Sequence, residues 1–269
     1  MLIEDLQNLV VEQRAIASRF LKRYVIIDFY LPKNTPPNQL SLLLVNDGQN
    51  LDEMPFAPML DQLIGTGQIQ PVLCAGIHAG KERKLEYGTA SVPDYENRGS
   101  KAEAYKNFIL EELLPFIHTS FAIDQFRKKA FAGFSLGGLT AMDLTWHHPE
   151  VFSTAGVFSG SLWWRSKSLE DDYNDATDRI MHHLVREGAY EPGLRFYFTT
   201  GSQDETADRN HNGIIDSIDD TLDLLAELEK KGYDRQKDLH YINFEDGKHD
   251  VATWGKAMPG FLLWAFGAR

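Results

Sequence analysis

Apolar segments of strand length alternate with helical segments along most of this 269-residue sequence. We expect strands at residues 23–31, 40–46, 71–78, 130–134, 152–158, 194–200 and 239–244. We expect helices at residues 55–64, 101–119, 136–148, 221–231 and 251–266. Strands separated by helices predict an α/β fold, with a mostly parallel sheet that carries helices on both faces.

Two long polar segments, residues 79–100 and 161–193, interrupt this alternation. Insertions of this size in an α/β domain usually lie over the functional edge of the sheet, so we expect them to cover an active site. No internal repeat or linker divides the sequence. We therefore interpret residues 1–269 as a single domain.

The most informative motif is Gly-Phe-Ser-Leu-Gly-Gly at positions 133–138. It has the form G-x-S-x-G and lies between an expected strand and an expected helix, which is the context of a nucleophile elbow. Small residues on both sides of Ser135 allow a tight turn that projects its hydroxyl above the sheet. The backbone N–H of Leu136, at the start of the helix, can face a developing oxyanion. The motif predicts Ser135 as a catalytic nucleophile.

A serine nucleophile needs a histidine base, and in this chain order the base follows the last strand. Three histidines lie late enough in the sequence, and we prefer His249, which follows the expected strand 239–244 through a short turn. His240 falls inside that strand, and His211 falls in an acidic loop. His249 is therefore the predicted general base.

The acid that orients the histidine should follow the preceding strand. Asp204 is the first carboxylate after the expected strand 194–200, with Glu205 as the reserve candidate and Asp208 behind it. For the second oxyanion donor, we expect the backbone N–H of Gln49, because Gly48 permits a close approach in the loop after the strand 40–46.

Together these residues resemble the esterase family that includes the enterochelin (iron-siderophore) esterases and is related to S-formylglutathione hydrolases and feruloyl esterases. The resemblance runs from about residue 16 to the end of the chain. The matching segments are Asp47-Gly48-Gln49, Arg83 with Glu86-Tyr87, residues 108–115, Gly133–Gly138, Ser159-Gly160-Ser161-Leu162-Trp163-Trp164, and Asp246–His249 with Trp254. The resemblance implies an α/β-hydrolase fold. It carries over Ser135, His249 and Asp204 as the triad, with Gln49 and Leu136 as the oxyanion pair.

Three further residues are candidate substrate contacts. Trp163 and Trp164 follow the strand next to the elbow strand, so one of them can form a pocket wall that stacks on an aromatic or sugar group. Both could instead belong to the core beneath the two insertions. Arg83 could bind an anionic group of the substrate, or it could be a solvated loop residue.

The function that this sequence predicts is a serine esterase that hydrolyses a carboxylic ester of a small molecule through an acyl-enzyme. Two alternatives stay open at this point. One is an acyltransferase that passes the acyl group to a sugar or alcohol, and the other is a ligand-binding module that kept the fold and lost turnover. We expect no cofactor for catalysis.

Residues 208–219 match the spacing of a 12-residue calcium loop. The expected ligands are Asp208, Asn210, Asn212, the carbonyl of Ile214, Asp216 and Asp219. Position 12 is Asp rather than the usual Glu, and we expect no long helix before the loop. The alternative is an acidic turn that caps the following helix, where the helix dipole favours carboxylates. We expect a structural calcium ion rather than a catalytic one.

The composition excludes other classes of protein. With 27 Lys and Arg against 39 Asp and Glu, the net charge is −12, which does not suit a general nucleic-acid binder. The sequence contains no run of 18 apolar residues, so it predicts no membrane span. The single cysteine, Cys74, cannot form an internal disulfide, and residues 1–20 contain no apolar signal segment. These features suit the cytoplasm, while the sequence does not set the oligomeric state.

Overall fold

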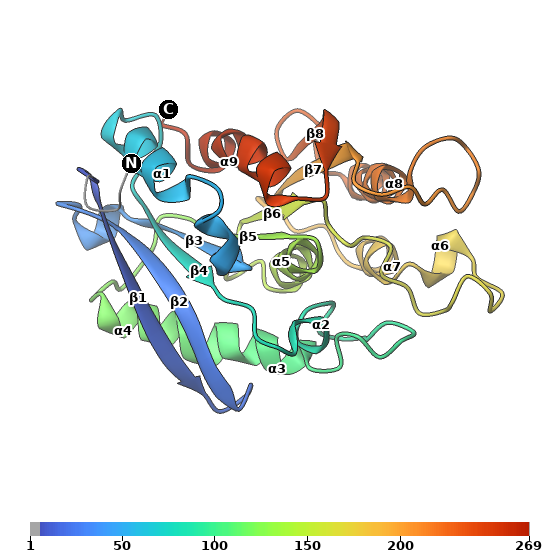
Figure 1. Cartoon of the computed structure of the whole chain (residues 1–269), viewed down its shortest axis with the longest axis horizontal. Helices are drawn as coiled ribbons and strands as arrows, with labels where there is room; N and C mark the ends of the chain where they lie inside the picture. The colour runs from blue at the N-terminus through green and yellow to red at the C-terminus, as the bar shows by residue number, and fades with distance from the viewer. Residues whose placement is uncertain (1–5, 269) are drawn as a thin grey trace.

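The computed structural model describes residues 6–268. Residues 1–5 and 269 lie outside this range, and the expectation of no signal segment at residues 1–20 therefore falls partly outside it. Within it, eight strands form one sheet in the order β1-β2-β4-β3-β5-β6-β7-β8 (Figure 1). The strands are β1 (Leu9–Ser18), β2 (Arg23–Pro32), β3 (Ser41–Asn46), β4 (Val72–Ile77), β5 (Lys129–Phe134), β6 (Thr154–Phe158), β7 (Arg195–Gln203) and β8 (Leu239–Lys248). From β4 to β8 neighbouring strands are parallel, whereas β1 and β2 are antiparallel additions at one end. The predicted α/β fold with a mostly parallel sheet is confirmed.

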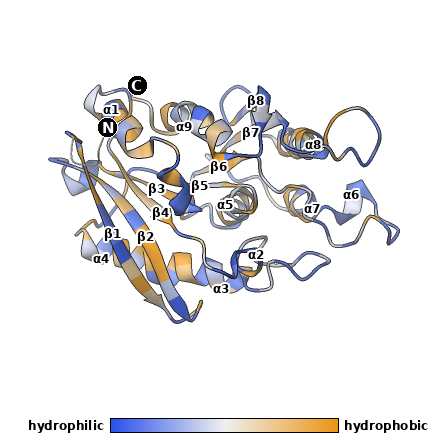
Figure 2. Ribbon diagram, viewed as in Figure 1, coloured by the Kyte–Doolittle hydropathy of each residue, from blue (hydrophilic) through white to orange (hydrophobic). Residues whose placement is uncertain are grey.

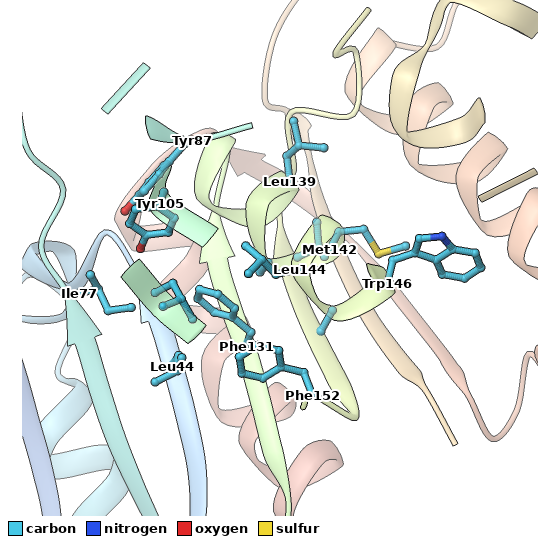
Figure 3. Close-up of a cluster of buried hydrophobic side chains, with 14 of the residues drawn as sticks. Leu44, Ile77, Tyr87, Tyr105, Phe131, Leu139, Met142, Leu144, Trp146 and Phe152 are labelled. Atoms are coloured by element: carbon cyan, nitrogen blue, oxygen red, sulfur yellow. The ribbon is translucent and has the colours of Figure 1, made fainter. Parts of the chain in front are cut away.

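Helices cover both faces of the sheet, as the strand β3 illustrates. All six of its residues are buried, and alternate side chains enter two separate apolar clusters. Leu43 and Val45 face the cluster that contains residues of α1 (Phe56–Gly65) and α9 (Val251–Phe266). Leu42 and Leu44 face the larger cluster on the other side; Figure 3 labels Leu44 there, and Figure 2 colours the ribbon by hydropathy. A strand buried on both faces reads as a continuous apolar run, which is why the sequence pattern was clear here.

The larger cluster is covered by other helical segments. These are α3 (Ala102–Asn107), the π-helical segment η4 (Phe108–Leu113), α4 (Leu114–Ser120), α5 (Leu136–His147), α7 (Ile180–Glu187) and α8 (Asp216–Lys231). The expected single helix 101–119 is therefore one helical rod with a π-helical middle. Cys74, on the strand β4, is a fully buried free thiol.

Three elements differ from the sequence expectations. The edge strand β1 was not expected; it pairs only with β2, and most of its residues are partly or fully exposed, so its apolar pattern is weak. The helix α8 begins five residues earlier than expected, at Asp216, and carries acidic residues in its first turn, where the helix dipole favours them. The segment expected as an irregular insertion, 161–193, contains α6 (Asp175–Asp178) and the amphipathic helix α7.

The other expected insertion, 79–100, contains the short helix α2 (Arg83–Glu86). None of the helices within residues 6–268 has both the length and the apolar character that crossing a membrane requires.

Candidate functional site

Ser135 lies on a sharp turn between β5 and α5. Its backbone has φ 55° and ψ −120°, a conformation that non-glycine residues adopt only when the surrounding structure enforces it. The two flanking glycines explain how the turn closes. A Cβ atom at Gly133 would lie 2.3 Å from the carbonyl oxygen of Gly137, and one at Gly137 would lie 2.8 Å from Asp47 Oδ2. The predicted elbow geometry is therefore present.

Asp204 and His249 follow the neighbouring strands β7 and β8, so the sheet brings them to the same edge as Ser135. The distance from His249 Nδ1 to Asp204 Oδ1 is 3.9 Å, which is within ion-pair range and too long for a hydrogen bond. The Asp204 side chain has no exposed area, whereas that of His249 is 39% exposed. The acid is thus held firmly inside the protein and the imidazole faces the solvent.

Burial shifts the pKa values of this pair in opposite directions. Desolvation raises the pKa of Asp204, although hydrogen bonds from Gly201 and Ser159 and the charge of His249 oppose this shift. Desolvation lowers the pKa of His249, against the opposing effect of the Asp204 carboxylate. Since a general base must be neutral before it accepts a proton, the lowered pKa of His249 suits that role near neutral pH.

One pocket of about 380 Å³ joins these residues. Its wall includes Ser135, Leu136, Asp204 and His249 from the predicted site, and Arg83, Lys84, Arg98, Ser159, Gly160, Ser161, Trp163, Glu205 and Ser217 around them. Both insertions contribute: Arg83 and Arg98 come from 79–100, and Trp163 from 161–193. Both expected insertions therefore line this pocket.

The sequence analysis named two serines of the pocket, Ser159 and Ser161, only as part of a matching segment and gave them no role. Ser161 Oγ lies 3.2 Å from Ser135 Oγ, and its backbone N–H donates to the carbonyl of Ser135. Ser159 donates a hydrogen bond to Asp204. Both follow β6, the strand beside the elbow strand, so their place after that strand was the signal that could have identified them.

The two predicted oxyanion residues differ in placement. Leu136 lines the pocket as the first residue of α5. Gln49 lies in the short 3-10 helix η3 (Gly48–Leu51), where its side-chain oxygen accepts a hydrogen bond from Ala79. Gly48 is needed there, because a Cβ atom would lie 2.2 Å from the backbone of Gly76. Gln49 is not among the residues that line the pocket, and its oxyanion role stays a prediction.

Arg83 is neither free nor fully solvated. Its guanidinium forms two short hydrogen bonds with the buried carboxylate of Asp47, at 2.6 and 2.7 Å, and lies over the ring of Tyr87. It nevertheless borders the pocket. The alternative of a solvated loop arginine is therefore wrong, and contact with an anionic substrate group stays a prediction.

The structure separates the two adjacent tryptophans. Trp163 is partly exposed and lines the pocket, with the guanidinium of Arg98 4.8 Å from its ring centre. Trp164 is fully buried and donates a hydrogen bond to Thr89. Its ring fills the space beside two glycines of the 79–100 insertion, so the expectation of substrate contact is corrected for Trp164, which is a core residue.

The late histidines that we set aside lie elsewhere. His240 stacks on Tyr197 within the sheet at a ring-centre distance of 4.7 Å. His211 is exposed in the acidic loop. Neither lines the pocket.

In the predicted calcium loop, Asp208 accepts hydrogen bonds from the backbone of Asn212 and Gly213, and Asp219 accepts from the side-chain amides of Asn210 and Asn212. Asp216 accepts from the backbone of Arg209, and Ile214 is exposed. The last two predicted carboxylate ligands, at 216 and 219, belong to the first turn of α8. Among residues 6–268, no three His, Cys, Asp or Glu side chains form a metal-binding group; the predicted set would also use asparagine and carbonyl oxygens.

Known proteins share this architecture. Residues 18–265 match the Esterase family, described as "Putative esterase". The uncharacterized protein YjcH of Bacillus subtilis is 23% identical over 92% of this chain and 94% of its own length. The iron(III) salmochelin esterase of Escherichia coli is 23% identical over 93% of this chain, which spans 56% of that protein.

The enterobactin esterase structure from Shigella flexneri has a TM-score of 0.73 and 19% identity, covering 94% of this chain and 58% of that one. This chain therefore spans little more than half the length of the two siderophore esterases. The likeness to the solved structure shows the fold, and the family match covers nearly the whole sequence. The chain belongs to this esterase family and is a carboxylic ester hydrolase.

Proposed function

We propose that this chain hydrolyses a small-molecule ester through an acyl-enzyme formed on Ser135. The observation that carries the proposal is that the strained Ser135 turn, His249 and the buried Asp204 border one pocket. A strained turn that presents a hydroxyl in the same pocket as a histidine is costly to build and supports a role in nucleophilic catalysis.

In the first half-reaction, Ser135 Oγ attacks the ester carbonyl while His249 takes the hydroxyl proton. The tetrahedral intermediate collapses, the C–O bond to the alcohol breaks, and His249 returns its proton to the leaving alkoxide. Asp204 stabilises the imidazolium that forms between these steps. The backbone N–H groups of Leu136 and Gln49 are the proposed donors to the oxyanion.

In the second half-reaction, His249 removes a proton from water, which attacks the acyl-enzyme carbonyl. Collapse of the second tetrahedral intermediate releases the carboxylic acid, and the proton returns to Ser135. The lowered pKa of His249 supports this sequence, because a neutral imidazole can accept the proton in each half-reaction.

The substrate class is tested with p-nitrophenyl acyl esters, feruloyl esters, acetylated sugars and ferric siderophores. Ferric siderophores are included because two relatives are named as iron(III) salmochelin and iron(III) enterobactin esterases. Wild type and Ser135→Ala are assayed side by side, with mass spectrometry of the quenched wild-type enzyme. Hydrolysis that needs Ser135, with an acyl adduct on that residue, supports the proposal. Full activity in Ser135→Ala contradicts it.

The alternative of acyl transfer is decided in the same assay by adding an alcohol or sugar acceptor. If the free carboxylic acid exceeds the transferred ester among the products, hydrolysis is the main reaction.

We also propose a structural calcium ion in the loop from Asp208 to Asp219. A cytoplasmic location is proposed from the single cysteine, Cys74, which is a buried free thiol.

A further inference from the structure

The Asp204 carboxylate is fixed by two donors other than His249. The backbone N–H of Gly201 donates to Oδ2 at 2.9 Å, and the hydroxyl of Ser159 donates to Oδ1 at 3.1 Å. Oδ1 is also the oxygen that lies nearest His249. The serine therefore acts on the same oxygen that would receive the imidazole N–H.

The hydroxyl of Ser159 is itself oriented by a third residue. Trp254 Nε1–H donates to Ser159 Oγ at 3.1 Å. Since the indole N–H can only donate, the serine oxygen must accept this bond, which leaves its single proton for Asp204. The two hydrogen bonds run in one direction, from Trp254 through Ser159 to Asp204.

The backbone of Ser159 is held in an uncommon conformation. Its φ is 44°, in the left-handed region that favours glycine, and its side chain is buried. Its N–H donates to the carbonyl of Thr199 on the neighbouring strand. A non-glycine residue keeps such a conformation only where the surrounding structure enforces it.

Trp254 also contacts the turn that carries the proposed nucleophile and the ring of the proposed base. Its ring stacks on Phe134, the residue before the nucleophile, at a centroid distance of 5.0 Å and an interplanar angle of 17°. The ring of His249 meets it edge-on at 5.3 Å. One buried indole thus packs against the elbow, contacts the base and directs the hydroxyl that binds the acid.

We propose that Ser159 and Trp254 are positioning residues, which hold the Asp204 carboxylate in the orientation that receives the Nδ1–H of His249. The proposal rests on the function proposed above. Asp204 is fixed before substrate arrives, while the half-exposed imidazole supplies the movement that shortens the 3.9 Å separation. Trp254 and Ser159 form a relay of two hydrogen bonds that ends at Asp204, and they act through that carboxylate rather than as members of the triad.

The relay has an electrostatic consequence. The Ser159 hydrogen bond stabilises the ionised carboxylate and so opposes the rise that burial causes in the pKa of Asp204. The other charged groups that act on the Asp204–His249 pair are Asp250, Arg83 and Glu205. Removing the hydroxyl leaves these groups in place and makes the carboxylate more basic. The pair then binds its proton at higher pH.

The test compares Ser159→Ala and Trp254→Phe with wild type over a full pH range. Alanine keeps the left-handed backbone as strained as serine does and removes only the hydroxyl. For Ser159→Ala we expect kcat/KM to fall about 10- to 100-fold, as for a lost hydrogen bond to a charged group. We expect the acidic limb of kcat/KM to move up by about one pH unit. Trp254→Phe keeps the ring against Phe134 and should shift the limb in the same direction by less.

Two matched controls separate positioning from general damage. Trp264→Phe changes a tryptophan on the same helix that packs on Tyr197 outside the pocket, and Ser166→Ala removes an exposed serine hydroxyl. Both should keep the wild-type pH profile. If Ser159→Ala fails to fold, Trp254→Phe alone decides the proposal. An unmoved acidic limb in the folded variants overturns the relay, even if kcat falls. Such a result leaves the proposed esterase mechanism standing, because that mechanism fails only if Ser135→Ala stays active.

Discussion

The elbow at residues 133–138 and the acidic loop, which runs from Asp204 after β7 to Asp219 in the first turn of α8, both line the same pocket, but different forces shape them. The elbow is fixed by steric contact: added Cβ atoms at Gly133 and Gly137 would meet backbone or carboxylate atoms at 2.3 and 2.8 Å. The acidic loop is shaped by hydrogen bonds and ion pairs instead. A short-range steric requirement selects particular residues, such as glycine, at fixed positions in the local sequence. A polar network depends instead on partners that are distant in the chain.

The partners of the acidic loop show this dependence. Arg209 in the loop and Arg179 at the start of α7 both bind the buried carboxylate of Asp220, at 2.5 and 2.7 Å. Arg209 also binds Asp175 in α6. These pairs connect the 161–193 insertion to α8 and to the segment that follows Asp204. No spacing in the sequence indicated them.

The largest expected effect lies in the elbow. Ser135→Ala should lower kcat by about 10⁶-fold and leave the fold intact, since the change removes one oxygen from a turn whose backbone is held by its glycines. The measurement is kcat with a p-nitrophenyl ester, with a thermal melt as the check on folding. Activity within tenfold of wild type would mean that a sterically defined elbow does not identify the nucleophile.

The second prediction concerns the base. His249→Ala should lower kcat nearly as much as Ser135→Ala, because the serine hydroxyl then lacks a proton acceptor. The matched control is His240→Ala, on the same strand region but stacked on Tyr197 outside the pocket. A severe loss of kcat in folded His240→Ala, with a mild one in His249→Ala, would reverse our choice between the two histidines.

How much the sequence could predict follows the same division. The sheet and the elbow could be predicted because buried strands such as β3 are continuous apolar runs and because the glycines mark the turn. Edge strand β1 could not, since it pairs on one side and is mostly exposed. Trp163 and Trp164 are adjacent and chemically alike. Only the packing of Trp164 against two glycines of another insertion places it in the core.

The third prediction compares two adjacent carboxylates. Asp204→Asn should lower kcat about 10⁴-fold, because the amide can stabilise neither the required tautomer nor the imidazolium. Glu205 also borders the pocket, and burial raises its pKa, but His249 pairs with Asp204. Glu205→Gln should therefore change KM more than kcat, with a total loss below about tenfold. The opposite order of kcat losses would move the acid by one residue.

The smallest expected effect concerns calcium in the acidic loop. A structural ion at saturating concentration would add about 3 kcal/mol of stability at 100 times its dissociation constant. For a chain of this size that corresponds to a rise in the melting temperature of about 5–10 °C relative to chelator. The loop begins four residues after Asp204, so chelation should also reduce activity, and added calcium should restore both.

The double variant Asp208→Ala with Asp216→Ala tests the site, provided that the calcium-dependent difference in melting temperature is measured. Asp216 also pairs with Arg209, so this variant loses stability even without an ion. Its melting temperature should be lower than that of wild type and should not respond to calcium. A wild-type protein whose melting temperature is the same in calcium and in chelator would show that the loop needs no ion. In that case the amides of Asn210 and Asn212 on Asp219, together with the Arg209 pairs, are sufficient to hold it.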